Sequence, residues 1–521
     1  MKRVLSRSVT YLSMMAMLVL LLAGCGANTS NNGAGQAGEG TTPNTETNQG
    51  SEEKPKEPFK FSIMANLHTP EVPDQTIEKM LEEATNTELD IRWVLDGSYE
   101  EKLNSAFATE SLPEAVYMKN QATFVMFRDA IRNDQFWEIG PYMKDYPNLS
   151  KLDEVVLNNT KVDGKLYGLY QERPLSRQGV IFRKDWADQL GLSAPKTIDE
   201  FYNMLKQFVE GDPDQNGKKD TIGLADRSDL IYGAFKTVSS YFGTPNNWGE
   251  QDGKLMPEFT FPQYIETMKF FQKLHQEGLI NHDFPVTSKN DQQDLIITGK
   301  AGVYIGSMAD VVTLNSKTTE VIPNAVFDVE NRVTGPQGTT GTWSIPGYGN
   351  IVLFPKSSVK SEEDLKQILA FFDKLMEPEF ANLVKWGIPD KHYTLTEDGR
   401  VQKVEDTKLT DREQKPYEIL QIGGESTIDM LTAFHSLPAK VKAEELILDN
   451  NSMLINDPTV ALDSETFAER GVQLQQIITD ATYKFILGNI DEAGFQKEVE
   501  RWMKEGGSDM IDEFNAQYQG Q

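Results

Sequence analysis

The sequence predicts an α/β fold made of two α/β units and a helical C-terminal region. Three observations lead to this prediction. Apolar runs alternate with amphipathic stretches from residue 59 to residue 118, a second alternating series begins near residue 179, and about 110 C-terminal residues have mainly helical patterns. Strands and helices that alternate along a chain are typical of parallel sheets with crossover helices.

The first unit begins in the order β-α-β-α-β. Ser98 and Glu101 have the spacing of a capping box, which is expected to open a helix that runs to about residue 110. The other expected elements are a helix at 74–84 and strands at 59–67, 89–95, 114–118 and 166–170. This order implies parallel strands joined by helices.

The second unit is expected to contain strands at 180–183, 221–225 and 302–305. Thr197 and Glu200 form another capping-box pattern, and the apolar residues that follow share one helical face. Pro262 is expected at the first position of a helix over 262–277, where no N–H donor is needed.

The remaining chain is predicted to be mostly helical. A strand at 350–354 precedes a helix capped by Ser361 and Asp364, whose apolar face carries Leu365, Ile368, Leu369, Phe372 and Leu375. No internal repeat with a period of roughly 20–50 residues occurs, so the pattern does not indicate a solenoid.

The composition is that of a soluble globular protein with a strongly acidic balance. Among 521 residues, 51 are Lys or Arg and 79 are Asp or Glu, which gives a formal net charge of −28. Nucleic acids and anionic membrane surfaces are bound by clustered basic residues, so the balance argues against both as partners. A single cysteine excludes a disulfide within the chain.

The N-terminus has the pattern of an export signal. Basic residues precede an apolar run at 11–22, which is too short to span a bilayer, and the run ends in Leu22-Ala23-Gly24-Cys25. This ending resembles the bacterial lipobox. It implies a signal peptide at 1–24 and a lipidated Cys25 that carries fatty acyl chains such as palmitate. The alternative is an ordinary signal sequence with a buried cysteine. Residues 25–57 are rich in Gly, Asn, Thr, Ser and Glu and are expected to form a disordered tether.

Five short segments carry little information separately, but their order along one chain is specific. They are Ala108-Thr-Glu-Ser-Leu-Pro-Glu114, Asp163-Gly-Lys-Leu-Tyr-Gly-Leu-Tyr170, Val180-Ile-Phe-Arg-Lys-Asp-Trp186, Trp386-Gly-Ile-Pro-Asp-Lys-His-Tyr393, and the run at 495–518. Over residues 58–518 the chain resembles the extracellular solute-binding proteins of bacterial ABC importers, and more narrowly their large oligosaccharide-binding lipoproteins.

This resemblance implies a two-lobed, periplasmic-binding-protein-like α/β fold with discontinuous lobes, a hinge and extra C-terminal helices. The first lobe is expected at 58–178 and 326–390, and the second at 179–325 and 391–521. The implied protein is a monomeric, extracytoplasmic substrate-binding subunit on a cell-membrane lipid anchor. It would capture an oligosaccharide between the lobes and deliver it to ABC permease subunits without catalysing a reaction.

Residues 212–223 have the spacing of an EF-hand calcium loop. Oxygen ligands are expected from Asp212, Asp214, Asn216, Lys218 (through its carbonyl) and Asp220. Gly217 allows the sharp turn, but Gly223 stands where the loop normally has a bidentate Glu. We expect a structural Ca²⁺ site that braces one lobe. A solvated polar turn is the alternative.

Sugar-binding sites combine aromatic faces with planar polar groups, because a sugar ring offers both a flat apolar face and hydroxyls. Trp343 and Tyr348 lie in a Gly- and Pro-rich loop, and Trp248 lies where the resembling family often has a stacking Trp. Tyr393 lies in a family-like segment. The other candidates are polar or aromatic residues at strand ends: Tyr170, Glu172, Arg173, Asp226, Arg227, Asn66, His68, Lys119 and Asn120.

Two other functions stay open from the sequence. A secreted polysaccharide lyase or glycosidase needs only two carboxylates, which 79 acidic residues supply in excess. Against an enzyme, the chain has no H-E-x-x-H, G-x-S-x-G or P-loop motif. The third alternative is a sensor that presents its ligand to a membrane kinase.

Overall fold

The computed structural model describes residues 57–69 and 71–518. The expected signal peptide at 1–24, the lipidated Cys25 and the tether apart from Glu57 lie outside these residues. Within them, no helix is both long and apolar enough to cross a membrane.

The first lobe is built on a five-stranded sheet with the order β2-β1-β3-β12-β4. Its strands are β1 (Phe59–Leu67), β2 (Thr87–Leu95), β3 (Ala115–Met118), β4 (Gly168–Glu172) and β12 (Tyr348–Leu353). β1 pairs in parallel with β2 and β3, as the β-α-β-α-β order predicts. β12 pairs antiparallel with both β3 and β4, so a strand from much later in the chain completes the sheet.

Helices cover this sheet, and the apolar residues of all of them except α14 (Thr407–Glu413) join those of the strands in one core. The helices are α1 (Thr76–Thr85), α2 (Asp96–Ala108), α3 (Gln121–Met126), α4 (Arg128–Arg132), α5 (Glu154–Asn159), α12 (Glu362–Leu375), α13 (Pro378–Trp386) and α14 (Thr407–Glu413), with short 3₁₀ turns η1 (Gly140–Asp145), η2 (Leu149–Lys151) and η6 (Lys415–Leu420). Ser361 caps α12 as predicted, since its Oγ accepts a hydrogen bond from the Asp364 amide at 3.1 Å.

The capping box predicted at Ser98 and Glu101 is wrong. α2 already begins at Asp96, and Leu95 occupies the cap position without a side-chain hydrogen bond. Ser98 therefore lies inside the helix, where its Oγ donates to the Leu95 carbonyl at 3.2 Å. The physical reason is that β2 passes directly into the helix, which leaves no loop for a separate capping residue.

The second lobe is built on a four-stranded sheet with the order β10-β5-β9-β6. Its strands are β5 (Gln178–Arg183), β6 (Ile222–Ala225), β9 (Ala301–Ser307) and β10 (Phe327–Glu330). β6 is parallel to β9, whereas β5 is antiparallel to β9 and β10. Thr197 caps α7 as predicted, because its Oγ1 accepts from the Glu200 amide at 3.2 Å.

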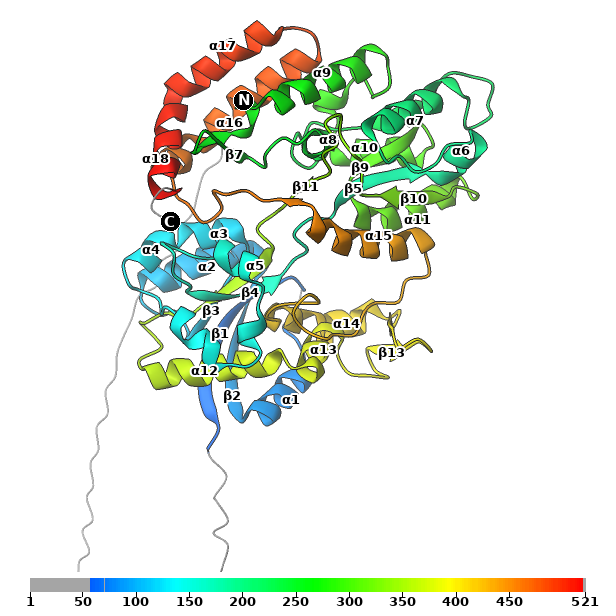
Figure 1. Cartoon of the computed structure of the whole chain (residues 1–521). Coiled ribbons are helices and arrows are strands. Elements are labelled where there is room, and N and C mark those ends of the chain that lie inside the picture. Colours follow the sequence, from blue (N-terminus) through cyan, green and yellow to red (C-terminus); the bar gives the residue numbers. More distant parts are fainter. Residues whose placement is uncertain (1–56, 70, 519–521) are drawn as a thin grey trace, which may run out of the picture. The chain divides into compact units, whose positions relative to one another are not determined.

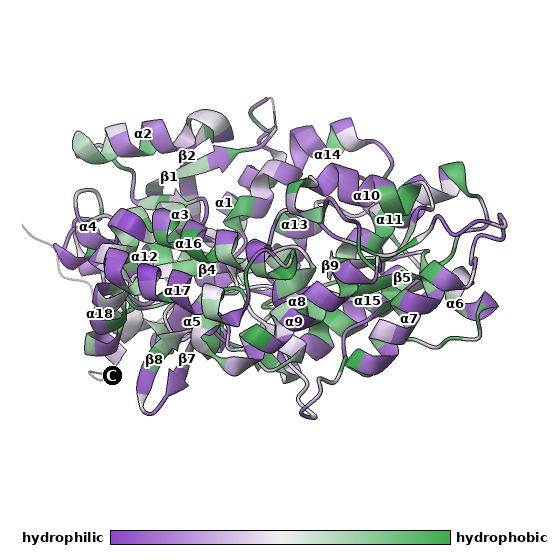
Figure 2. Ribbon diagram, turned by 90° about the horizontal axis from the view of Figure 1, so that it is seen from above, coloured by the Kyte–Doolittle hydropathy of each residue, from purple (hydrophilic) through white to green (hydrophobic). Residues whose placement is uncertain are grey.

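The helices of this lobe include the four C-terminal ones that the sequence predicted as a helical region. They are α6 (Lys184–Gln189), α7 (Ile198–Glu210), α8 (Ala234–Tyr241), α9 (Pro262–Gln276), α10 (Lys289–Ile297), α11 (Val311–Val321), α15 (Pro438–Asp449), α16 (Glu465–Ile486), α17 (Glu492–Trp502) and α18 (Ser508–Tyr518). Figure 1 shows the orange and red helices α15–α18 beside the green elements of this lobe, and Figure 2 shows hydrophilic and hydrophobic residues alternating along the helices.

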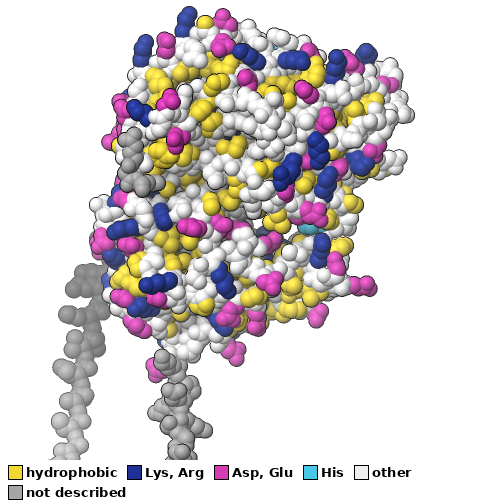
Figure 3. All heavy atoms as spheres, in the orientation of Figure 1, with side chains coloured by type: hydrophobic (Ala, Val, Ile, Leu, Met, Phe, Trp, Pro, Cys, Tyr) yellow, Lys and Arg dark blue, Asp and Glu magenta, His cyan; other side chains and the backbone are white. Residues whose placement is uncertain are grey.

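Smaller elements complete the fold. Hairpins form between β7 (Trp248–Gln251) and β8 (Lys254–Pro257) and between β13 (Tyr393–Leu395) and β14 (Val401–Lys403), while β11 (Thr342–Trp343) pairs with β15 (Leu454–Ile455). Short turns are η3 (Glu258–Thr260), η4 (Phe284–Val286), η5 (Met308–Asp310), η7 (Asn450–Ser452) and the π-type η8 (Met503–Gly507). On the face in Figure 3, basic side chains are interspersed with acidic ones.

The expected lobe boundaries need two corrections. Residues 327–330 are expected from the sequence in the first lobe, but as β10 they pair with β5 in the second sheet. Residues 391–430 are expected from the sequence in the second lobe, but Tyr417 is buried in the first core. Its hydroxyl donates to the Asp74 carbonyl at 2.8 Å. Gly423 also extends the first sheet, since its amide donates to the Tyr170 carbonyl at 2.8 Å. Figure 1 shows the same grouping, with yellow α12–α14 beside the blue strands.

Two connections between the lobes run next to each other and are hydrogen-bonded together. Residues 173–177 lead from β4 to β5, and residues 344–347 lead from β11 to β12. The Arg173 amide donates to the Gly347 carbonyl, and the Ile345 amide donates to the Leu175 carbonyl, both at 2.8 Å. The backbone of the crossing segments is therefore held in place.

Candidate functional site

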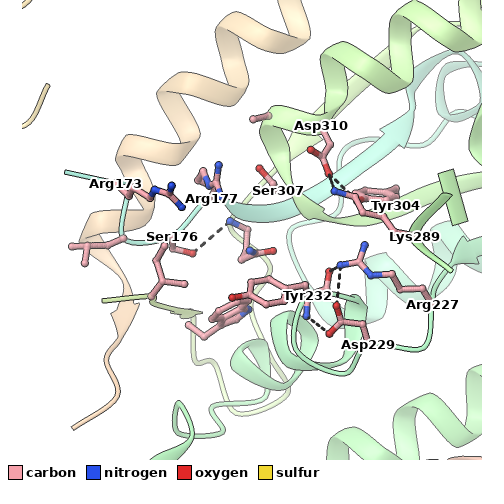
Figure 4. A pocket seen from close by; sticks show the side chains of 15 residues that line it. Arg173, Ser176, Arg177, Arg227, Asp229, Tyr232, Lys289, Tyr304, Ser307 and Asp310 are labelled. Atoms are coloured by element: carbon pink, nitrogen blue, oxygen red, sulfur yellow. Dashed lines mark hydrogen bonds and ion pairs between the residues drawn. The ribbon is translucent and has the colours of Figure 1, made fainter. Parts of the chain in front are cut away.

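A pocket of about 510 Å³ lies where the two connections meet the second sheet. This volume falls within the usual range for small-ligand sites. Its walls come from four parts of the chain: the connection at 173–178, the turn at 227–232, residues 289–310 and the connection at 343–345. Figure 4 shows ten of its residues labelled, with polar and charged side chains on several sides of the cavity.

An aromatic pair forms one wall of the pocket. The rings of Tyr232 and Trp343 meet edge to face with their centroids 5.6 Å apart. The Trp343 indole N–H donates to Thr237 Oγ1 at 3.0 Å, which fixes that ring, while Tyr232 is 52% exposed. An exposed ring supported by a fixed one is a suitable platform for the apolar face of a sugar.

Trp343, which is expected from the sequence to contact the ligand, lines the pocket but is only 4% exposed, and sequence reasoning missed the exposed Tyr232. Asp229 holds the turn that presents Tyr232, since its Oδ1 accepts from the amides of Ile231 and Tyr232 at 3.0 and 2.9 Å. An Asp side chain that accepts hydrogen bonds from the amides two and three residues later is a common local sign of a turn. The Asp229-x-x-Tyr232 spacing after an expected strand could have identified this aromatic residue.

Two buried polar groups that line the pocket have no hydrogen-bond partner among the described residues. Gln178 and Ser307 are opposite each other on β5 and β9, and both line the pocket. Gln178 Oε1 and Ser307 Oγ are buried and unpaired. A buried polar atom without a partner is costly, so a ligand hydroxyl that reached either atom would remove that cost. Sequence reasoning did not single out either residue.

Charged side chains surround these groups. Arg227, a predicted site residue, lines the pocket and donates to Gln292 Oε1 at 2.9 Å, to Asp229 at 3.4 Å and to the Tyr232 carbonyl. Asp310 accepts from the Tyr304 hydroxyl at 2.8 Å and lies 3.5 Å from Lys289. These contacts hold the acidic and basic groups of this wall in fixed positions.

Asp226, also a predicted site residue, lies behind the pocket rather than in its wall. Its Oδ1 accepts from the Ala234 amide at 2.9 Å, and its own amide donates to Asn281 Oδ1 at 2.8 Å. Burial raises the pKa of this carboxyl to about 7. Asp226 thus positions the Arg227 turn and does not present its carboxylate to a ligand.

Four aromatic candidates lie in hydrophobic clusters rather than in the pocket, which corrects the prediction. Trp248 packs against Phe514 with ring centroids 4.9 Å apart, because β7 turns it into the second core. Tyr348 and Tyr170 lie in the first core, because both are strand residues of the first sheet, and burial raises the pKa of Tyr348 to about 12. Tyr393 forms a small separate cluster with nearby apolar residues.

The candidates at the first sheet's strand ends do come together, but they do not line the pocket. Asn66 Nδ2 lies 2.9 Å from His68 Nε2, and it donates to Asp96 Oδ1 at 3.1 Å. Lys119 Nζ donates to the Asp96 carbonyl at 3.2 Å. Asn120 caps α3 by accepting from the Thr123 amide at 2.9 Å. These residues lie at strand ends of the first sheet, whereas the pocket is formed mainly by the second sheet and the connections.

Glu172 lies at the end of β4 and does not line the pocket. Its Oε2 accepts from the Ser426 amide at 3.3 Å, and burial raises the pKa of the carboxyl. The next residue, Arg173, which is also a candidate for ligand contact, does line the pocket. Arg177, which sequence reasoning missed, lines it from the same connection.

The predicted calcium loop lies between α7 and β6 and gathers its acidic side chains around one residue. The Asn216 amide donates to Asp212 Oδ1 at 3.0 Å, and the Asn216 Nδ2 donates to Asp214 at 2.6 Å and to Asp220 at 3.0 Å. The Asp214 pKa is raised, chiefly by burial and also by the two neighbouring carboxylates. Within residues 57–69 and 71–518, no group of three or more acidic, His or Cys side chains is arranged as a ready metal site.

The loop contains oxygen atoms of the kind that Ca²⁺ prefers, but its carboxylates accept hydrogen bonds from local N–H groups instead of being arranged around one ion. Asp212 and Asp220 would bind an ion by the same oxygens that now accept from Asn216 and Gly217.

Comparison with known proteins gives both family and fold. The family described as "Bacterial extracellular solute-binding protein" matches residues 69–381. "Polygalacturonan/rhamnogalacturonan-binding protein YtcQ" of Bacillus subtilis (strain 168) is 42% identical over 509 residues, which is 96% of each chain. "Lipoprotein LipO" of the same strain is 35% identical over 470 residues, covering 88% of this chain and 92% of LipO.

A solved structure shares the architecture. The "HMO binding ABC-transporter associated Solute Binding Protein" from Bifidobacterium longum infantis aligns with a TM-score of 0.67 over 88% of this chain and 98% of that chain, at 16% identity. The two-lobed periplasmic-binding-protein fold that the sequence predicted is thereby confirmed.

Proposed function

The chain belongs to the bacterial extracellular solute-binding protein family, and we propose that it is the lipid-anchored, monomeric subunit of an ABC importer that captures an oligosaccharide. The ligand binds in the pocket between the connections and the second sheet, and the loaded protein delivers it to permease subunits. No chemical step is assigned to the protein itself.

The observation that carries this proposal is the pairing of an aromatic platform with unpaired polar groups in one pocket. Tyr232 offers an exposed ring, while Gln178 Oε1 and Ser307 Oγ are buried without partners. Sugars are recognised by stacking of their apolar face and by hydrogen bonds to their hydroxyls, so this combination fits a carbohydrate better than an apolar ligand.

The position of the pocket supports a binding protein that changes conformation with its ligand. Arg173, Ser176 and Trp343 lie on or beside the two connections between the lobes. A ligand that contacts such segments interacts differently with each arrangement of the lobes, and only such a difference shifts a conformational equilibrium. Permease docking would then distinguish loaded from empty protein.

The names of the relatives support the finer parts of the proposal. YtcQ is named for binding polygalacturonan and rhamnogalacturonan, and LipO is named as a lipoprotein. Together with the Leu22-Ala23-Gly24-Cys25 pattern, they favour a carbohydrate ligand and an extracytoplasmic protein anchored through Cys25. We also propose that the 212–220 loop binds a structural Ca²⁺ ion.

A thermal-shift screen against a panel of neutral and acidic oligosaccharides tests the function. A ligand present at 100 times its Kd stabilises the folded state by about 2.7 kcal/mol, so a specific sugar should raise the Tm measurably. Prolonged incubation should leave the sugar intact by chromatography. A panel without any shift contradicts the binding role, and the appearance of cleaved sugar would favour the lyase or glycosidase.

A further inference from the structure

We propose that the pocket selects acidic oligosaccharides, and that Arg173 and Arg177 bind the carboxylate of a uronic acid residue. This inference rests on the proposed function and names the chemical class of its ligand. It assigns a specificity-determining role to two residues of the connection between β4 and β5.

The two guanidinium groups have no partner in the part of the chain that the structure describes. Among the described residues, no hydrogen bond or ion pair involves either side chain, although both line the pocket. Figure 4 shows both groups on the side of the pocket where Ser176 lies, away from Arg227 and Lys289. Both side chains are exposed at the cavity, so their guanidinium groups are available to an external anion.

The acidic residues of the pocket already have partners within the protein. Asp229 accepts from two amides of its own turn and from Arg227, while Asp310 accepts from Tyr304 and lies near Lys289. Four basic and two acidic side chains line the pocket. Because the acidic pair is matched by Arg227 and Lys289, the charge of Arg173 and Arg177 is left uncompensated.

Backbone hydrogen bonds position both arginines. The Arg173 amide donates to the Gly347 carbonyl, and the Arg177 carbonyl accepts from the Met308 amide, both at 2.8 Å. The Arg173 side chain also passes close over Gly349, where an added Cβ would lie only 2.8 Å from Nε. The absence of a side chain at residue 349 therefore leaves the space that Arg173 occupies.

The geometry of the groups favours a carboxylate on a sugar. A guanidinium presents a planar fork of N–H donors that matches the two oxygens of a carboxylate. The same pocket holds the exposed ring of Tyr232 and the unpaired oxygens of Gln178 and Ser307. One uronic acid residue could thus contact an arginine through its carboxylate while its neighbours stack or bond through hydroxyls.

The test compares trigalacturonate with its fully methyl-esterified form by isothermal titration calorimetry on the folded chain without its signal peptide. The ester keeps the size and hydroxyls of the acid and removes its charge. Because hydrogen bonds to charged groups are the stronger ones, the acid should bind roughly 10- to 100-fold more tightly than the ester. Its affinity, unlike that of the ester, should fall as NaCl is raised.

Arg173→Gln and Arg177→Gln should each weaken acid binding by about tenfold or more while leaving ester binding and Tm unchanged. Gly349→Ala should act like Arg173→Gln, because it displaces the side chain without removing its charge. Arg501→Gln is the matched control, since Arg501 lies on α17 and pairs with Glu505. It should bind both probes like the parent chain.

Equal affinity for acid and ester in the parent chain, or a preference that survives in both arginine variants, overturns this inference and leaves the oligosaccharide-binding function standing. If only the neutral sugars of the panel bind, the inference about acidic oligosaccharides is likewise overturned and the oligosaccharide-binding function still stands. If no saccharide of the panel binds, the proposed function itself fails. A loss of both probes with a lowered Tm in the arginine variants would assign these residues a structural role.

Discussion

Tyr232 and Trp248 both come from loop-rich stretches of the second lobe, but their surroundings differ. Tyr232 is 52% exposed beside the pocket, whereas Trp248 is 8% exposed and packs on Phe514. Tyr232→Ala should therefore cost about 2–4 kcal/mol of sugar affinity, in the range of binding hot spots, with little change in Tm. Calorimetric titration and thermal melting measure the two effects separately.

The paired variant Trp248→Ala should show the opposite behaviour. Removing a large buried ring leaves a cavity, so the free energy of unfolding should fall by about 3–5 kcal/mol while the folded fraction binds sugar normally. A Tyr232 variant that melts early with full affinity, or a Trp248 variant that loses affinity with an unchanged Tm, would reverse these two assignments.

Glu78 on α1 predicts a pH dependence of stability. Burial, and next the charge of Glu82, raise the Glu78 pKa to about 7. An unfolded Glu has a pKa of about 4.3, so between these values the folded state binds a proton that the unfolded state lacks. The stability from this group is full below about pH 4 and is lost as the pH rises towards 7.

Glu78→Gln should therefore raise the free energy of unfolding by about 1–3 kcal/mol above pH 7 and should flatten its decline between pH 5 and 7. Denaturant titrations at pH 5, 6, 7 and 8 measure this. Glu83→Gln, on the exposed side of the same helix, is the control and should keep the decline of the parent chain. A steeper decline in the Glu78 variant would contradict the assignment.

At the scale of elements, the loop between α7 and β6 gives a prediction about calcium. The carboxylates of Asp212, Asp214 and Asp220 repel one another without a cation, so an ion bound only by the folded loop adds stability by mass action. Lacking a bidentate Glu, the loop should bind with a Kd of roughly 10⁻⁴–10⁻³ M, as in extracellular modules. Excess chelator should lower the Tm by several degrees.

Asp214→Ala should reproduce that loss and make the Tm insensitive to chelator, whereas Asp252→Asn, in the β7–β8 turn, should stay sensitive. Sugar affinity should change little, because the loop does not line the pocket. Identical melting curves in excess chelator and excess Ca²⁺ would return the segment to a solvated polar turn.

Elements whose signals are local were predicted well. β1 has both predicted ends, and the caps at Thr197 and Ser361 accept the hydrogen bonds that their spacing indicates. α2 is the exception, because a strand that runs directly into a helix removes the loop on which a capping box depends. Periodicity and capping involve only residues within a few positions of one another, so they can be predicted from the sequence.

At the scale of the whole molecule, anchoring is the prediction that depends on the N-terminal sequence alone. Cys25→Ser removes the thiol to which a lipid would be attached, so the variant should be released or remain unprocessed. Phase partitioning in a detergent, with the parent chain alongside, measures this. A variant that enters the detergent phase like the parent would show that Cys25 is not the anchor.

By itself, the sequence determined the alternation of strands and helices, the two α/β lobes and the helical C-terminus. It also named Trp343, Arg173 and Arg227 as candidates, and the structure places these three in the wall of the pocket. These follow from local patterns, strand ends and a resemblance spread along the chain.

Only the tertiary structure decided which segments share a lobe and which side chains face the pocket. β10 joins the second sheet by pairing with β5, and Tyr417 enters the first core from a segment expected elsewhere. Gln178 and Ser307 meet across two strands far apart in the chain. The pairing partner of a strand and the exposure of a side chain depend on which distant segment packs against them. That contact is set by the whole fold, so no local sequence pattern predicts it.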